Sequence, residues 1–302
     1  MLKKKKRDKE FVLFILFAVT VPVLNWIVFY IYPNLSSIVM AFQDSQGKLS
    51  FVNFERLWTE FHLPTSQIRI AVKNTLITFS ITFACFIPRV FVSFLIYKKI
   101  PGYRVFRILF FLPSILFSVC LAMCFTRMVG TNGFIAKFVG EVLHLGRTPE
   151  LLADSRFANY TIWAQMIWLG FPGDLIIWGG TFARIPADVL EAGRMDGVNW
   201  FTEFTKITVP LVWPTVALKM VLTVCGLMAA TGQVYLLTGG DYGTMTLSAW
   251  MYKTLIQSSG TKYTSNVYNY LSAVGLVMTV ISVGLALVVR TYTDKKFSDV
   301  DF

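Results

Sequence analysis

Long apolar runs separated by short basic segments are the feature that most limits how this chain can fold. A bilayer-spanning helix needs about 20 mostly apolar residues. Runs of about that length cover residues 11–32, 70–97, 108–129, 160–182, 207–227 and 270–289. A bilayer core admits only helices or closed barrels, because every backbone polar group there needs an internal partner. We therefore expect an all-α, polytopic membrane protein with about six transmembrane helices.

Composition and charge agree with a membrane location and argue against nucleic-acid binding. The chain is 55% hydrophobic and only 15% charged, whereas soluble domains are about a quarter charged. The net charge of +11 comes from basic residues that cluster at the ends of apolar runs, which is typical of membrane proteins. The first run is too long for a signal peptide and lacks a small-residue cleavage site, so we expect it to be retained.

The distribution of lysine and arginine predicts the orientation of the chain. An even number of spans puts both termini on one side, and basic residues are retained in the cytoplasm during insertion. Placing the N-terminus inside makes Lys and Arg about three times as dense in the internal segments as in the outer loops. We expect both termini to be cytoplasmic.

The charged stretch 184–210 reads as a docking element on the cytoplasmic side. Pro186 can start a helix, and Asp188 is favoured in its first turn by the helix dipole. Ala192 and Gly193 remove side-chain bulk, so another protein can approach closely. Gly197 can supply a left-handed C-cap. A small-faced helix, a turn and a second short helix are therefore expected before the fifth span.

This stretch resembles the EAA loop of the permease subunits of ABC importers. The family pattern is Glu-Ala-Ala, three residues, Gly, nine residues and Ile-x-Leu-Pro; here Glu191-Ala192-Gly193, Gly197 and Ile207-Thr208-Val209-Pro210 keep that spacing. Gly193 replaces the second Ala and Val209 replaces Leu. Asp196 before Gly197 is similar to the carbohydrate-uptake branch.

Shorter stretches along the chain extend the resemblance. They are Lys73-Asn74-Thr75-Leu76, Phe106-Arg107 with Phe111-Leu112-Pro113, Trp168-Leu169-Gly170-Phe171, and Leu237-Thr238-Gly239-Gly240 with Thr246-Leu247 and Tyr252. Asp241 departs from the proline that usually follows the two glycines. The resemblance implies the MetI-like permease fold of type I importers. It also implies three parts: residues 1–69 with the first span and an outer loop, a core transmembrane domain over 70–291, and a cytoplasmic tail over 292–302.

The resemblance also implies partners in a bacterial plasma membrane. These are a cytoplasmic ATPase dimer, a second permease that is homologous but not identical, and an extracellular or periplasmic solute-binding protein. Glu191, Ala192, Gly193, Asp196 and Gly197 would contact the ATPase. ATP and Mg would be bound by that subunit, so we expect no cofactor, no metal and no catalytic residue on this chain.

Charged residues inside the apolar runs point to the substrate path. Arg89, Asp174 and Lys219 are such residues, and intramembrane charges usually face protein or water. Asp174 either contacts a sugar, with Trp178 beside it, or pairs with Arg89 or Lys219. Gln233 and Tyr235 are further candidates for the path.

Other classes of function fit the sequence less well. His62 and His144 have no neighbouring cluster of carboxylates or cysteines, and there is no glycine-rich phosphate loop. An ion-coupled secondary transporter would normally show paired repeats with broken helices, which are not visible. The leading hypothesis is a sugar or oligosaccharide importer permease; a permease for a non-sugar solute is the alternative.

Overall fold

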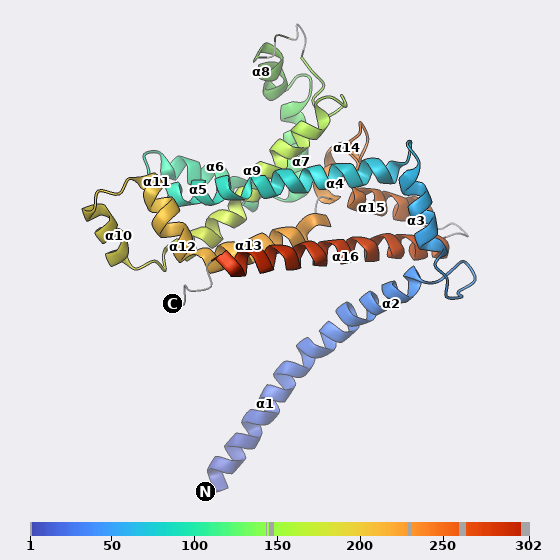
Figure 1. Ribbon diagram of the computed structural model, residues 1–302, viewed down its shortest axis with the longest axis horizontal. Coiled ribbons are helices and arrows are strands. Elements are labelled where there is room, and N and C mark those ends of the chain that lie inside the picture. The colour runs from blue at the N-terminus through green and yellow to red at the C-terminus, as the bar shows by residue number, and fades with distance from the viewer. Residues whose placement is uncertain (1, 143, 145–147, 229–230, 260–263, 297–302) are drawn as a thin grey trace. The chain divides into compact units, whose positions relative to one another are not determined.

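The computed structural model describes residues 2–142, 144, 148–228, 231–259 and 264–296, and the elements named in these ranges are all helical (Figure 1). Packing divides the chain into two units. One comprises Met1–Glu60 and Leu255–Thr279, and the other comprises Phe61–Thr254 and Val280–Phe302. An all-α fold is therefore confirmed over the described residues.

The first unit begins with an uninterrupted helical rod. It consists of α1 (Leu2–Trp26), a π-helical turn η1 (Ile27–Ile31) and α2 (Tyr32–Ala41). The predicted first span, residues 11–32, lies within this rod, and the helix continues beyond it to Ala41. Pro33 stands at the start of α2, where a missing N–H is tolerated. The polar side chains beyond it donate to backbone carbonyls one turn earlier, with Asn34 bonding Tyr30 at 2.6 Å, so the helix continues.

The same unit is closed by polar contacts between α3 (Val52–His62) and α16 (Thr264–Lys296). The hydroxyl of Tyr270 donates to Glu60 Oε2 at 2.6 Å. Arg56 lies 4.2 Å above the Tyr270 ring and is bonded to Glu60 at 2.8 Å. Tyr270 is thus held by a hydrogen bond and a cation–π contact together.

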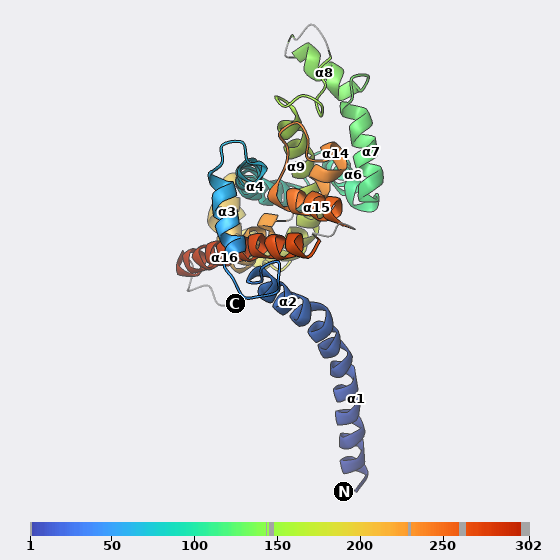
Figure 2. The ribbon, with the colours of Figure 1, turned by 90° about the vertical axis from the view of Figure 1, so that its right-hand side faces the viewer.

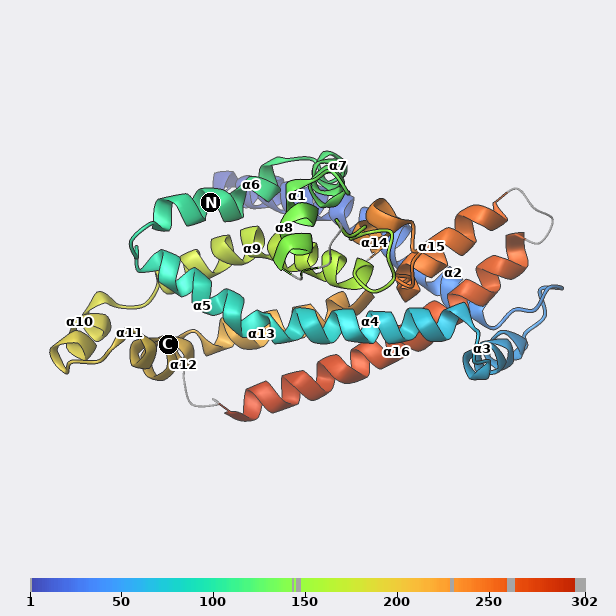
Figure 3. The ribbon, with the colours of Figure 1, turned by 90° about the horizontal axis from the view of Figure 1, so that it is seen from above.

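Helix α9 (Ala158–Phe182) is the centre of the second unit. It packs against α4 (Gln67–Ala84), α5 (Phe86–Tyr97), α6 (Tyr103–Ile115) and α14 (Thr231–Thr238) (Figure 3). Its 25 residues give a length of about 38 Å, enough to cross a bilayer core of about 30 Å. It coincides with the predicted fourth span.

Two predicted spans are bent rather than straight. Helices α6 and α7 (Ser118–Val129) meet at 118°, and α7 packs against α8 (Phe134–Val142) and α14 (Figure 2). Pro113 lies in the last turn of α6 and contributes no N–H to the helix, which favours an end there. Trp200–Leu211 and α13 (Trp213–Cys225) meet at 79°.

By length and composition, three helices in the described ranges can cross a membrane alone: Phe14–Ala41, Gln67–Tyr97 and Ser265–Lys295. Counting each bent pair as one span gives up to five. Helix α9 is outside this set because it carries polar residues such as Gln165 and Asp174. The remaining elements are α10 (Ala187–Met195), α11 (Trp200–Thr202), η2 (Glu203–Thr208), α12 (Val209–Leu211), η3 (Gly226–Met228) and α15 (Leu247–Ser258).

Candidate functional site

The stretch 184–210 forms the predicted helix–turn–helix. Helix α10 has Asp188 in its first turn and ends in a Schellman motif, in which the Val198 N–H donates to the Gly193 carbonyl at 3.1 Å. Gly197 has φ = +71°, a conformation that glycine adopts without strain. The prediction that Gly197 caps this helix is confirmed.

The second arm of this element starts at Asn199. Its side chain accepts hydrogen bonds from the N–H groups of Phe201 at 3.1 Å and Thr202 at 2.9 Å, the arrangement of a helix N-cap. The chain continues through α11, the π-helical η2 and α12 before it bends into α13. Both ends of the turn are therefore fixed by local hydrogen bonds.

The five residues expected to contact an ATPase divide into two groups. Glu191, Ala192, Asp196 and Gly197 are exposed, whereas Gly193 is buried. A Cβ atom at Gly193 would lie 2.8 Å from Ile207 Cδ1. Gly193 therefore allows α10 to pack closely on η2 of its own chain, and the small surface that remains open is at Ala192.

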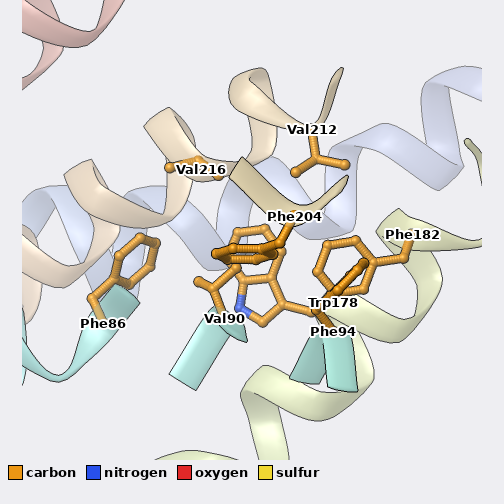
Figure 4. Close-up of a cluster of buried hydrophobic side chains, with 8 residues drawn as sticks. All are labelled: Phe86, Val90, Phe94, Trp178, Phe182, Phe204, Val212 and Val216. Carbon is orange, nitrogen blue, oxygen red and sulfur yellow. The ribbon is translucent and has the colours of Figure 1, made fainter. Parts of the chain in front are cut away.

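A buried hydrophobic cluster joins η2 to three longer helices. Figure 4 shows the ring of Phe204 from η2 lying among side chains from α5, α9 and the start of α13. The Phe204 and Phe94 rings are 5.2 Å apart. The cluster consists of Phe86, Val90, Phe94, Trp178, Phe182, Phe204, Val212 and Val216.

An ion pair reinforces the same junction. Lys98 follows α5, and its Nζ pairs with Glu203 Oε1 at 2.5 Å. The Lys98 side chain is 18% exposed and that of Glu203 is 7% exposed. Ion pairs shielded from water in this way are screened less than surface pairs. Helix η2 is thus attached to α5 by both apolar and ionic contacts.

Asp174 is shared between two cations. Its Oδ2 lies 3.2 Å from Arg89 Nη1, and its Oδ1 lies 2.9 Å from Lys219 Nζ. Asp174 and Arg89 are 4% and 9% exposed. The sequence left open whether Asp174 pairs within the protein, and the structure shows that it pairs with both partners. We call Arg89, Asp174 and Lys219 the charged triad.

The guanidinium of Arg89 is anchored on two sides. Nε donates to the Cys85 carbonyl at 3.2 Å and Nη2 to the Thr82 carbonyl at 3.0 Å. A Cβ atom at Gly170 would lie 2.3 Å from Nη1. Gly170 on α9 therefore provides the space through which Arg89 reaches Asp174.

Arg89 also lines a cavity of about 240 Å³ in the second unit. The cavity combines hydroxyl, amide and cationic groups with apolar side chains, a mixture typical of small-molecule sites. Its lining consists of Thr78, Phe79, Thr82, Arg89, Met166, Leu169, Gly170, Thr223, Gly226, Leu227 and Gln233.

The candidates for the substrate path are only partly brought together. Gln233 lines the cavity beside Arg89, the partner of Asp174. Trp178 is fully buried in the hydrophobic cluster instead. Tyr235 makes an edge-to-face contact with Tyr252, with ring centroids 5.0 Å apart. Sequence reasoning missed the threonines of the cavity, because a threonine within an apolar run gives no distinctive signal.

Among the described residues, no group of three or more His, Cys, Asp or Glu side chains is placed to hold a metal ion.

The chain is similar to several sugar-transport permeases. It is 24% identical to the multiple sugar-binding transport system permease protein MsmF of Streptococcus mutans, over 92% of this chain and 93% of that protein. It is 25% identical to the lactose transport system permease protein LacF of Rhizobium radiobacter, over 74% and 77%. A 30% identical match to the maltose/maltodextrin permease protein MalF of Vibrio parahaemolyticus spans 53% of this chain but only 30% of that protein.

Solved structures share the fold. A chain of a bacterial ABC transporter that imports the acidic polysaccharide alginate superimposes with a TM-score of 0.78 at 19% identity, covering 97% of this chain and 98% of that one. A second alginate transporter structure, in complex with an alginate pentasaccharide-bound periplasmic protein, gives 0.77 at 19% identity, with 100% and 99% covered. The fold is that of an ABC importer permease.

The family described as binding-protein-dependent transport system inner membrane component matches residues 77–298. The match includes the helix–turn–helix, the charged triad and the cavity. This chain belongs to that family of membrane-embedded transport permeases.

Proposed function

We propose that this chain is one of two permease subunits of an ABC importer in a bacterial plasma membrane and that it carries a saccharide. The observation that carries the proposal is the construction of α10. This helix leaves Ala192 and its acidic neighbours exposed while its own chain fixes it through Gly193 and Ile207. Such an element is suited to transmit a displacement from a partner to the helices behind it.

The partner at α10 would be a cytoplasmic ATPase. A movement of α10 would reach η2 through the Gly193–Ile207 contact and then α5, α9 and α13 through the hydrophobic cluster. Packed interfaces of this kind shift between discrete arrangements rather than deforming continuously. The partner would bind ATP and Mg and would hydrolyse the ATP. This chain would respond by changing the access to its cavity.

A saccharide is the cargo that the relatives and the cavity favour together. The relatives named above transport sugars. The cavity is lined by threonines, Gln233 and Phe79, a combination of polar and aromatic residues that suits a ligand with both hydroxyl groups and apolar C–H faces. A solute-binding protein on the outer side and a second, homologous permease would complete the path.

Replacement of Gly197 tests the coupling role of α10. A β-branched residue at φ = +71° adds strain of about 1–3 kcal/mol at the end of the helix. We expect Gly197→Val to abolish ATP-driven saccharide uptake by the reconstituted importer while membrane insertion stays normal. The measurement is uptake of labelled maltotriose, raffinose and digalacturonate into proteoliposomes that contain all subunits.

Gly47→Val is the matched control, because Gly47 also has a positive φ of +78° and no atom within 4 Å of its added Cβ. This variant should transport normally. Normal uptake by Gly197→Val would contradict the assignment of α10 as the coupling helix.

A further inference from the structure

The cavity is surrounded by more positive than negative charge. The segments that contribute to its lining are α4, α5, α9, α13, η3 and α14, and Asp174 is the single acidic residue in their sequences. Asp174 is bonded to two cations, Arg89 and Lys219. In the part of the chain that the structure describes, neither Arg89 nor Lys219 forms a salt bridge with a second acidic residue, so the charged triad carries one excess positive charge.

An uncompensated charge at this depth is costly. The Lys219 side chain is 21% exposed and that of Arg89 is 10% exposed, so water screens them poorly. Buried charges usually have partners, and intramembrane charges that lack full compensation mark functional sites. The triad would reach neutrality if a ligand supplied one negative charge.

Arg89 is the member of the charged triad that lines the cavity, so a ligand would meet the triad there. Lys219 forms an ion pair with Oδ1 of Asp174, and Arg89 forms one with Oδ2. The single negative charge is therefore shared between two cations and does not fully neutralise Arg89. A guanidinium has five N–H donors. Among the described residues, Nε and Nη2 of Arg89 each donate to a backbone carbonyl and Nη1 forms an ion pair with Asp174, so further N–H groups remain for a ligand. Arginine also presents its donors in a planar fork that matches a carboxylate.

We infer that the cavity accepts an acidic sugar unit whose carboxylate binds at Arg89, with Gln233 and the hydroxyl oxygens of Thr82 and Thr223 contacting its hydroxyl groups. Each of these two hydroxyls donates to a carbonyl of its own helix, so it can accept from a ligand. The inference rests on the proposed saccharide transport and specifies its substrate class. The cavity of about 240 Å³ is smaller than the roughly 300–1,000 Å³ of sites for drug-sized ligands. It therefore takes one sugar ring at a time.

Removal of the excess charge tests the inference. Lys219→Met leaves a neutral Arg89–Asp174 pair, so the fold should be retained. We expect binding of digalacturonate to the intact importer complex in nanodiscs to weaken about 10- to 100-fold, the range for a lost charge-assisted interaction. Binding of the neutral, carboxyl-reduced disaccharide should not change. Isothermal titration calorimetry gives both affinities, and Lys219→Arg should restore acidic binding.

Lys137→Met is the matched control, because Lys137 is an exposed residue of α8 that belongs neither to the charged triad nor to the cavity lining. It removes the same charge and should leave both affinities unchanged. Equal binding of the acidic and neutral disaccharides to the wild-type complex, or an unchanged preference in Lys219→Met, would overturn the inference alone. Failure of both disaccharides and of the neutral oligosaccharides to bind or be transported would overturn the proposed function as well.

Discussion

At the scale of single residues, two glycines provide space for a specific neighbour. A Cβ atom at Gly193 would lie 2.8 Å from Ile207 Cδ1, and one at Gly170 would lie 2.3 Å from Arg89 Nη1. Contacts below about 3 Å are not tolerated by packed side chains, so the neighbour has to move. In both places the glycine determines how closely two parts of this chain approach each other.

Shortening the neighbour should therefore rescue a substitution of Gly193. We expect Gly193→Ala to reduce saccharide-stimulated ATPase activity of the complex, because the methyl group pushes α10 away from η2. Adding Ile207→Val removes Cδ1 and should restore most of the activity. Ile207→Val alone should cost only about 0.5–1.5 kcal/mol in stability. If the double variant is as defective as Gly193→Ala, the contact does not explain the glycine.

The sequence shows that residues 192 and 193 are small, but it does not show which of them faces a partner and which faces its own chain. Their spacing in the Glu-Ala-Gly pattern puts them on adjacent positions of one helix. Which of the two turns inward depends on where Ile207 lies, and that is set by the turn at Gly197 and Asn199. A contact across such a turn cannot be read from a local pattern.

At the scale of elements, the apolar runs predicted where helices lie but not where they change direction. The run 108–129 contains a 118° bend between α6 and α7. Hydropathy does not reveal this bend, because the residues on both sides of it are similarly apolar. The extension of the first helix to Ala41 was missed for a related reason: Asn34 and Ser37 look polar in sequence, yet they bond to carbonyls of their own helix.

The ion pair between Lys98 and Glu203 should hold η2 against α5. We expect Glu203→Met to destabilise the protein by about 3–5 kcal/mol, since it leaves a largely buried cation without its partner. The double variant Lys98→Met/Glu203→Met should be more stable than Glu203→Met alone. Thermal denaturation of the four proteins of this cycle in nanodiscs measures the coupling. Additive effects of the two substitutions would show that the pair contributes nothing.

At the scale of the whole molecule, α5, α9 and α13 are joined at two neighbouring levels. The hydrophobic cluster connects them through Phe86, Trp178 and Val216, and the charged triad connects them through Arg89, Asp174 and Lys219. The triad residues are three or four positions from cluster residues on each helix, which is one helical turn. If η2 moves, the cluster side chains that it shifts are therefore one helical turn from the charged triad, and Arg89 of the triad lines the cavity.

The predicted orientation of the chain can be tested with single cysteines. In a variant without Cys85, Cys120, Cys124 and Cys225, Ala192→Cys should react with a membrane-impermeant maleimide only in inside-out vesicles. Gln46→Cys, in the first predicted outer loop, should react only in intact cells. Labelling of Ala192→Cys from outside the cell would contradict both the cytoplasmic position of α10 and its proposed contact with an ATPase.

The close packing of Gly193 on Ile207 bears on how subunits of this family can be recombined. A chimera that receives α10 from another permease brings a foreign residue at position 193 next to a resident side chain at position 207. An alanine there would wedge the transplanted helix away from its support even if it matched the new ATPase well. A chimera should therefore exchange the whole helix–turn–helix from Ile185 to Pro210, so that positions 193 and 207 come from the same protein.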